Sequence, residues 1–390
     1  MLIKRTLMKR NQELADFEVD PVTGEVRVID ASEAGADLHA SADLSRIIRR
    51  RAVSRRRADN QDVLASFGAL SPIHLALMGH GLSLSDQYWY RAPGSADRWE
   101  DINFFDNEWD PGFGTAILKR DYTGLASCSP DVPDVTTSGQ LIKAWEHNDD
   151  GICLIKESWR PDGADLQGVK LTTDLCALLF DEDCYVPVDI VERYGRPCSA
   201  SPLMLARDEE FADGGQLYAL TGMREGPDTD MGSAMKQESF QARIEDFAAV
   251  GIPDASAHVA RMACLSCLAL LANFHKENFG VIYNVASDAR RAAPIFDYDG
   301  SFGFRDDDSE IANLCARPRI AAMLCASRFS FLDTSWDWTW YDPQVLEGFE
   351  DRIMEALAPY HSFPSNFSTL VANLFVMQRA YVNEITAGQV

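Results

Sequence analysis

The stretch of the sequence that is most informative about the fold is residues 273–282, which read NFHKENFGVI. It follows the apolar residues 259–271, whose length and composition predict a buried helix. Residues 279–283 are rich in aromatic and β-branched side chains, which predicts a short strand. A polar loop between a buried helix and a strand is typical of a catalytic loop, and its candidate functional side chains include His275 and Asn278.

A second candidate site lies downstream, in residues 294–301, which read PIFDYDGS. Asp297 follows residues 293–296, which we expect to form a strand, and residues 284–291 are the expected turn of a hairpin. Such a hairpin would bring the side chains of Asn278 and Asp297 together. Amide and carboxylate oxygens suit Mg²⁺, so the pair predicts a magnesium site. An ordinary acidic turn is the alternative interpretation of Asp297.

Two aromatic-rich segments near the amino terminus carry the most specific resemblance to a known family. Residues 82–89 read LSLSDQYW and residues 99–107 read WEDINFFDN. In this order and spacing they resemble the amino-terminal module of bacterial HipA-like proteins, which are related to the HipA toxin kinases.

The resemblance implies an α+β, protein-kinase-like two-lobed fold, with a β-rich small lobe and a mainly helical large lobe behind a small α/β amino-terminal module. We expect the module in residues 1–135, the small lobe in 136–206 and the large lobe in 207–390. Apolar segments between residues 311 and 385 agree with a helical lobe. Residues 111–138 are rich in Gly, Ser, Pro and Asp, which predicts a linker. The implied cofactors are ATP and Mg²⁺.

The family pattern at the first stretch is N-x-D-x-H-x-x-N-F, in which the Asp is the catalytic carboxylate. His275, Asn278 and Phe279 match, so the resemblance implies that His275 braces the loop and that Asn278 and Asp297 bind metal and nucleotide. The catalytic Asp is missing. Counted without gaps its position holds Asn273, and the alternative is that two residues, the Asp among them, have been deleted before His275.

Two further elements depart from the family pattern. Residues 141–147 and 152–156 are expected to form a hairpin around a turn at 148–151. Lys156 ends its second, apolar strand and resembles the lysine that contacts the nucleotide phosphates. The stretch after it, residues 157–163, contains a single glycine and the bulky Trp159, which is poor for a phosphate-binding loop. Val169 occupies the place in the next helix where a glutamate should pair with the lysine. Together with Asn273, these departures favour a pseudokinase that acts by binding or regulation.

Two alternatives remain open at this point. One is an active serine/threonine kinase that uses another carboxylate, such as Glu277 or Asp299, as its base. The other is a protein that binds a polyanion or an acidic partner through residues 46–57, which hold seven arginines and no acid in a chain of net charge −24. The bland interpretation is a solvated helix that docks on acidic parts of the same molecule. These arginines are Arg46, Arg49, Arg50, Arg51, Arg55, Arg56 and Arg57.

Composition limits the remaining classes. Nine cysteines at irregular spacing argue against a disulfide framework, and we interpret Cys264 and Cys267 as small core residues of a helix. Lysines and arginines interrupt the apolar residues 1–10, so no secretory signal or membrane span is expected, and the expected location is the cytoplasm. Relatives of HipA often act with a DNA-binding antitoxin, which makes an antitoxin-like protein a candidate partner.

Overall fold

The computed structural model describes residues 1–31, 44–149, 151–221, 236–304 and 307–387. The chain divides into two compact units. Unit 1 comprises Met1–Glu157, Glu192–Gly195 and Leu205–Glu210, and unit 2 comprises Ser158–Val191, Arg196–Met204 and Phe211–Val390. Short insertions from later in the chain therefore complete unit 1.

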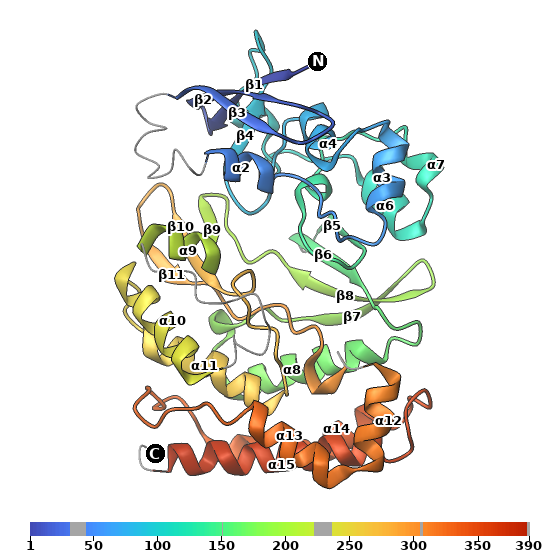
Figure 1. The fold of residues 1–390 in the computed structure, drawn as a ribbon, viewed down its shortest axis with the longest axis vertical. Helices are drawn as coiled ribbons and strands as arrows, with labels where there is room; N and C mark the ends of the chain where they lie inside the picture. Colours follow the sequence, from blue (N-terminus) through green and yellow to red (C-terminus); the bar gives the residue numbers. More distant parts are fainter. Residues whose placement is uncertain (32–43, 150, 222–235, 305–306, 388–390) are drawn as a thin grey trace. The chain divides into compact units, whose positions relative to one another are not determined.

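An antiparallel sheet opens unit 1, with strand order β3-β2-β1-β4 (Figure 1). Its strands are β1 (Ile3–Lys9), β2 (Gln12–Val19), β3 (Val26–Ala31) and β4 (Tyr88–Arg91). Gly24 adopts a φ of 73° in the turn between β2 and β3, a conformation that favours glycine. Leu7, Phe17 and Tyr90 are buried on one face of the sheet, where Ile48 of α2 (Leu44–Arg50) packs against them.

Helices follow the sheet in unit 1, and they overturn one expectation. Residues 111–138 are not a linker, because they form α6 (Pro111–Lys119), α7 (Tyr122–Leu125) and η1 (Pro133–Thr136). The carboxylates of Asp110 and Asp121 cap the first two helices, and Phe113 and Ile117 are buried. The turn-forming residues that suggested a linker therefore serve as helix caps.

The remaining described elements of unit 1 are short helices and a hairpin. Helices α3 (Asn60–Phe67), α4 (Pro72–Met78) and α5 (Trp99–Ile102) are short. Strands β5 (Lys143–Asn148) and β6 (Gly151–Glu157) form the expected antiparallel hairpin, in which Lys156 lies opposite Lys143.

Unit 2 is mainly helical. Helix α8 (Ala164–Leu179) and the turn η2 (Glu182–Cys184) lead to strands β7 (Asp189–Arg193) and β8 (Arg196–Pro202). A small sheet of order β11-β10-β9 comes from β9 (Glu209–Asp213), β10 (Gly280–Asn284) and β11 (Arg290–Ala292). The helices after β9 are α9 (Gly214–Thr221), α10 (Gln237–Ala249), α11 (Ala255–Leu268), η3 (Ser301–Gly303), α12 (Asp308–Ala316), α13 (Pro318–Arg328), η4 (Pro343–Leu346), α14 (Phe349–Leu357) and α15 (Phe367–Thr386).

Helix α11 is the centre of the unit 2 core. It is buried almost all round, which explains why its sequence shows no polar face. Cys264 and Cys267 are fully buried within it, and all nine cysteines of the chain are free, so the core interpretation of this pair is confirmed. Helix α15 packs against α11 and α14 and closes the core on the carboxyl-terminal side.

The expected strand at residues 293–296 is wrong. The strand of this hairpin is β11, which ends at Ala292. Pro294 has no N–H to donate, and Ile295 instead exchanges backbone hydrogen bonds with the segment after η2, from Ile295 N to the Cys184 oxygen and from Val186 N to the Ile295 oxygen. Asp297 therefore lies in a turn that is anchored to the segment after η2, and it does not end a strand of the hairpin.

In the parts of the chain that the structure describes, no helix is both long and apolar enough to cross a membrane.

Candidate functional site

The loop that follows α11 turns sharply before it reaches β10. Leu270 adopts a φ of 51°, and the backbone N–H of His275 donates to the Asn273 oxygen at 2.9 Å. The N–H of Asn278 in turn donates to the His275 oxygen at 2.8 Å. These bonds fold residues 273–278 into a compact turn and direct Asn273 and Asn278 to the same side.

The structure brings together three of the side chains that the sequence singled out. Asn278 Nδ2 donates to Asp297 Oδ2 at 2.9 Å and to the Asn273 backbone oxygen at 2.9 Å. Asn273 Nδ2 lies 3.4 Å from the same Asp297 Oδ2. Asn273 and Asn278 are buried, whereas Asp297 is half-buried. The cluster therefore joins the loop after α11 to the turn after β11.

Asp297 carries backbone strain. Its φ of 60° lies in the left-handed region, which costs a residue with a Cβ about 1 kcal/mol. Such strain persists only where the surroundings enforce it, and it gathers at functional sites. Here the next residue is fixed, since the hydroxyl of Tyr298 donates to the Ile295 oxygen at 2.8 Å or to the Val186 oxygen at 3.0 Å.

One atom of the cluster fits a cation. Asn273 Oδ1 is buried and has no hydrogen-bond partner in the described structure. A buried acceptor without a partner is costly, and a metal ion or an ordered donor would relieve the cost. Asn273, Asn278 and Asp297 carry the hard oxygen donors that Mg²⁺ prefers. Both asparagines direct Nδ2 to Asp297 Oδ2, so their amides would rotate to present oxygens to the same ion.

His275 is half-exposed at the edge of the turn. Its Nδ1 lies 3.3 Å from the backbone N–H of Glu277, so this nitrogen accepts a hydrogen bond and the ring orientation is fixed from within the loop. This contact agrees with a bracing role, which remains a prediction.

The sequence analysis missed a buried residue that supports the loop after α11. Arg243 of α10 is fully buried and its Nη2 donates to the Phe274 oxygen at 2.6 Å. Its guanidinium also stacks on the rings of Phe240 and Phe279, 4.7 Å from each centroid. The available signal was an arginine on the apolar face of a helix, where a charge is kept only if it is bonded.

Lys156 and this cluster belong to different units of the chain. Lys156 is half-buried on β6 in unit 1, whereas Asn273, Asn278 and Asp297 belong to unit 2. In unit 2, Val169 is buried on the apolar side of α8. The roles that the resemblance implies for Lys156 and for the position of Val169 therefore stay predictions.

The arginine-rich segment is not one continuous cationic surface. Arg51 is buried and binds both the Asp86 carboxylate, at 2.6 Å, and the backbone oxygens of Gly81 and Tyr88. Arg57 is buried in a pair with Asp59, with Nε 2.7 Å from Oδ1. The prediction that all seven arginines form one surface patch is therefore wrong. The exposed ones are Arg49, Arg50, Arg55 and Arg56, and Arg46 is half-exposed.

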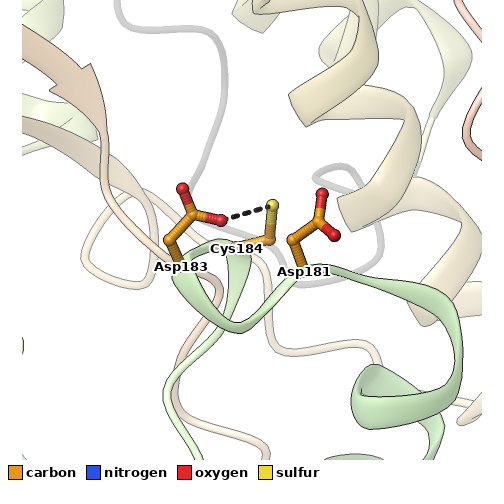
Figure 2. Close-up of side chains that lie close together, drawn as sticks. All are labelled: Asp181, Asp183 and Cys184. Atoms are coloured by element: carbon orange, nitrogen blue, oxygen red, sulfur yellow. Dashed lines mark hydrogen bonds between the residues drawn. The ribbon is translucent and has the colours of Figure 1, made fainter.

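A group with metal-binding side chains lies at η2, where the sequence suggested no site. Figure 2 shows Asp181, Asp183 and Cys184 extending to the same side of the turn, with their ligand atoms within 4.8 Å of one another. Both carboxylates are exposed, and burial raises the pKa of the Cys184 thiol. Metals bind the thiolate, so a thiol with a raised pKa makes this turn a poor site.

Comparisons with known proteins define the fold. No protein-family model and no curated protein matches the sequence. Among solved structures, the chain is similar to HipA of Shewanella oneidensis MR-1, solved with HipB and operator DNA as a toxin–antitoxin system, at a TM-score of 0.50 and 11% identity over 97% of both chains. It is also similar to the Helicobacter pylori proinflammatory kinase CtkA, at a TM-score of 0.44 and 10% identity over 62% of this chain and 92% of that one.

The match to HipA covers nearly the whole chain, and at this identity it establishes the fold alone. The protein therefore has an α+β HipA-like kinase fold, as the sequence resemblance implied.

Proposed function

We propose that this protein is a pseudokinase, which retains a Mg-nucleotide pocket and acts by binding or regulation. The observation that carries the proposal is the identity of residue 273. It contacts the Asp297 carboxylate, 3.4 Å away, from the position where the kinase pattern has its catalytic Asp, and it is an asparagine.

A carboxamide cannot perform the task of the missing carboxylate. In phosphoryl transfer the catalytic Asp orients the attacking hydroxyl and accepts its proton. An amide has no basic site near neutral pH, so this assistance is lost. General-base assistance contributes about 10²- to 10⁴-fold to such reactions, so at most slow transfer should remain.

Other residues keep the side chains that their implied roles require, whereas residues 157–163 and Val169 depart from the pattern. Lys156 would hold the phosphates, and Asn278 and Asp297 would hold Mg²⁺ through their side-chain oxygens, with the orphaned Asn273 Oδ1 close by. When bound, Mg²⁺ would neutralise phosphate charge. His275 would keep the loop in place. The binding of ATP and Mg²⁺ is thus the part of the proposal that can be tested first.

The alternative of an active kinase has a specific candidate. Glu277 is exposed and lies in the same loop, and Asp299 is half-buried two residues after Asp297. Either carboxylate would have to approach the attacking hydroxyl in place of residue 273. Incorporation of labelled γ-phosphate that is lost in Glu277→Gln or Asp299→Asn would establish this alternative.

A protein partner is the second alternative. The HipA structure contains HipB and operator DNA, and exposed arginines remain on this chain at Arg49, Arg50, Arg55 and Arg56. A partner that binds through these arginines would dissociate as salt increases. Alanine substitution of the four arginines would then abolish binding without changing the response to nucleotide.

The test of the main proposal is binding of Mg-ATP, measured by calorimetry and by thermal unfolding. A ligand at 100 times its Kd stabilises the folded state by about 2.7 kcal/mol, which corresponds to a rise of a few degrees in Tm. Asp297→Ala and Asn278→Ala should abolish the rise. Glu355→Ala, which removes an exposed carboxylate of α14, is the matched control and should keep it. Absence of binding by the unaltered protein would refute the proposal.

A further inference from the structure

The segment Leu205–Glu210 has an unusual place in the chain. It comprises residues between β8 and β9 and the first two residues of β9, yet it belongs to unit 1, whereas the residues on both sides of it belong to unit 2. It also contains the expected boundary between the small and large lobes, at residues 206 and 207. The residues that hold this segment within unit 1 are Lys9, Arg10 and members of the two aromatic-rich sequences, 82–89 and 99–107.

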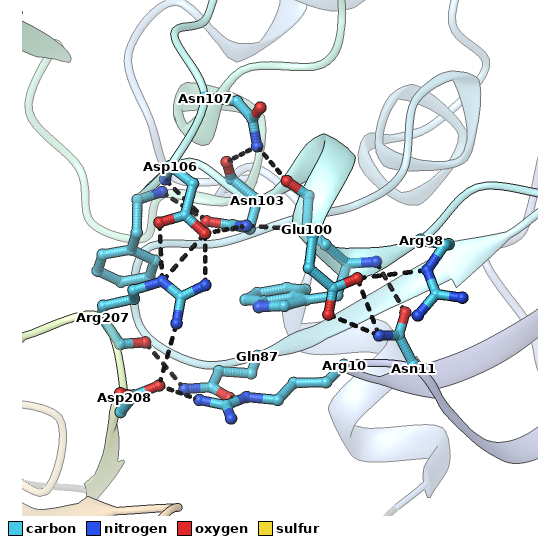
Figure 3. Close-up of polar contacts among 12 residues, drawn as sticks. Arg10, Asn11, Gln87, Arg98, Glu100, Asn103, Asp106, Asn107, Arg207 and Asp208 are labelled. Carbon is cyan, nitrogen blue, oxygen red and sulfur yellow. Dashed lines mark hydrogen bonds and ion pairs between the residues drawn. The ribbon is translucent and has the colours of Figure 1, made fainter.

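Gln87 is the centre of these contacts (Figure 3). It is completely buried, and its backbone N–H donates to Glu210 Oε1 at 3.2 Å. Its side-chain Nε2 donates to the backbone oxygen of Arg207 at 3.0 Å. Its side-chain and backbone oxygens accept from Arg10, through the Arg10 Nε and the Arg10 N–H. All four hydrogen-bonding groups of Gln87 are therefore used, two of them on the segment.

Arg10 is held in a strained conformation beside Gln87. Its φ of 49° lies in the left-handed region, which is costly for a residue other than glycine. The indole Nε1 of Trp89 donates to the Arg10 oxygen at 2.7 Å, and the Arg10 guanidinium pairs with Asp208. Arg10 lies in the two-residue turn between β1 and β2, a kind of turn that uses positive φ, and this turn directs the guanidinium to the segment.

The second sequence holds the segment through Asp106. The guanidinium of Arg207 binds the Asp106 carboxylate with two parallel bonds, from Nε to Oδ1 at 2.7 Å and from Nη2 to Oδ2 at 2.6 Å. Asn103, which is completely buried, orients this carboxylate through its Nδ2 at 3.0 Å and accepts the Asp106 N–H at 2.9 Å. A bidentate pair on a fixed carboxylate restricts geometry as well as position.

The last residue of the segment, Glu210, is buried and its carboxylate pairs with a lysine. Glu210 is 1% exposed and its Oε2 lies 3.1 Å from Lys9 Nζ, which is itself mostly buried. A buried carboxylate that loses its partner destabilises strongly, so this pair resists separation of the segment from β1. The contacts thus fix the segment at its middle, through Arg207 and Asp208, and at its end, through Glu210.

We propose that Arg10, Gln87, Asn103 and Asp106 form a clamp that fixes the conformation of the Leu205–Glu210 segment and thereby regulates nucleotide binding. The second part rests on the proposed function, because the segment is the connection between the two lobes that the kinase-like fold implies. The clamp residues are positioning residues and touch no nucleotide in this proposal. The two aromatic-rich sequences are accordingly a device for controlling the connection.

The experiment measures amide hydrogen exchange in the full-length protein without nucleotide. Gln87→Leu removes the side-chain bonds at similar volume, and Asp106→Asn weakens the exposed pair with little risk to folding. Both should raise exchange in peptides that cover residues 205–210 at least about fivefold, while peptides from β5 and β6 stay unchanged. Glu100→Gln is the control, since its carboxylate binds Asn11 and Arg98 and not the segment, and it should change neither.

Two exchange results would overturn the clamp: unchanged exchange at residues 205–210 in both variants, or an equal rise throughout unit 1, which would indicate general loosening. The link to nucleotide is decided by calorimetry with Mg-ATP. Gln87→Leu should change the Kd severalfold and Glu100→Gln should not, and an unchanged Kd in Gln87→Leu would overturn the link. If the unaltered protein binds no Mg-ATP, the proposed function and this link fail together, while the exchange result still decides the clamp.

Discussion

Asp134 gives the protein a pH-dependent stability that a single substitution should remove. It is 1% exposed in η1 of unit 1. Its Oδ1 accepts the backbone N–H of Trp145 at 3.0 Å, and its Oδ2 is buried without a hydrogen-bond partner in the described structure. Burial raises the pKa of the carboxyl to about 7, although the nearby Arg57 opposes the shift.

The sign of the effect follows from the two pKa values. An unfolded chain releases this proton near pH ~3.9, whereas the folded protein keeps it up to about pH 7. The contribution of Asp134 to the free energy of unfolding is therefore most favourable at low pH, and it falls by about 1.4 kcal/mol per pH unit between the two pKa values. From pH 5 to pH 8 the carboxyl should cost the folded state on the order of 3 kcal/mol.

Asp134→Asn cannot ionise, so it should lose this dependence while its oxygen still accepts the Trp145 N–H. Urea unfolding of both proteins at pH 5 and pH 8 measures the difference. Asp134→Asn should gain on the order of 3 kcal/mol relative to the unaltered protein as the pH rises. Any constant cost of the amide cancels in this comparison. An identical change with pH in both proteins would refute the reasoning.

Two further substitutions probe the packing around the candidate site. In Gly280→Ala the new Cβ would lie 2.1 Å from the backbone oxygen of Ala212, so thermal unfolding should show a loss of stability of more than about 2 kcal/mol. Gly251→Ala is the comparison: its Cβ would meet nothing within 4 Å, and its φ of 84° should cost about 1 kcal/mol. Similar losses in the two variants would contradict the close approach at Gly280. Arg243→Met keeps the aliphatic part of the side chain but removes the hydrogen bond to the Phe274 oxygen. It should lower stability by about 2 to 3 kcal/mol in the same assay and weaken Mg-ATP binding. Unchanged stability and unchanged binding would show that the loop needs no support from α10.

The sequence predicted those parts of the fold in which local pattern and packing agree. The hairpin of β5 and β6 and the buried helix α11 follow from apolar runs with clear ends. The expected linker at residues 111–138 failed because Asp110 and Asp121 look the same in a loop and at a helix N-terminus. The strand expected at 293–296 failed because Ile295 pairs with a distant segment, which no local pattern reveals.

The candidate site could be predicted in part from the sequence. The proximity of Asn278 and Asp297 could be expected from two motifs, although through a hairpin that ends earlier than expected. Arg243 could be suspected from its place on the apolar face of a helix, whereas its contact with Phe274 could not, because that contact joins elements that are far apart in the sequence. The apparent patch at residues 46–57 misled because Arg51 is buried against Asp86, which is distant in the sequence, and Arg57 is buried against Asp59, which lies just beyond the segment.

The central claim is that this chain of kinase-like fold lacks the catalytic carboxylate, at residue 273, and it is tested most directly by restoring that group. Transfer of labelled γ-phosphate from Mg-ATP should be barely detectable for the unaltered protein and should rise about 10²-fold or more in Asn273→Asp. Asn273→Asp combined with Asp297→Ala should lose the gain. Transfer by the unaltered protein that equals or exceeds that of Asn273→Asp would contradict the account.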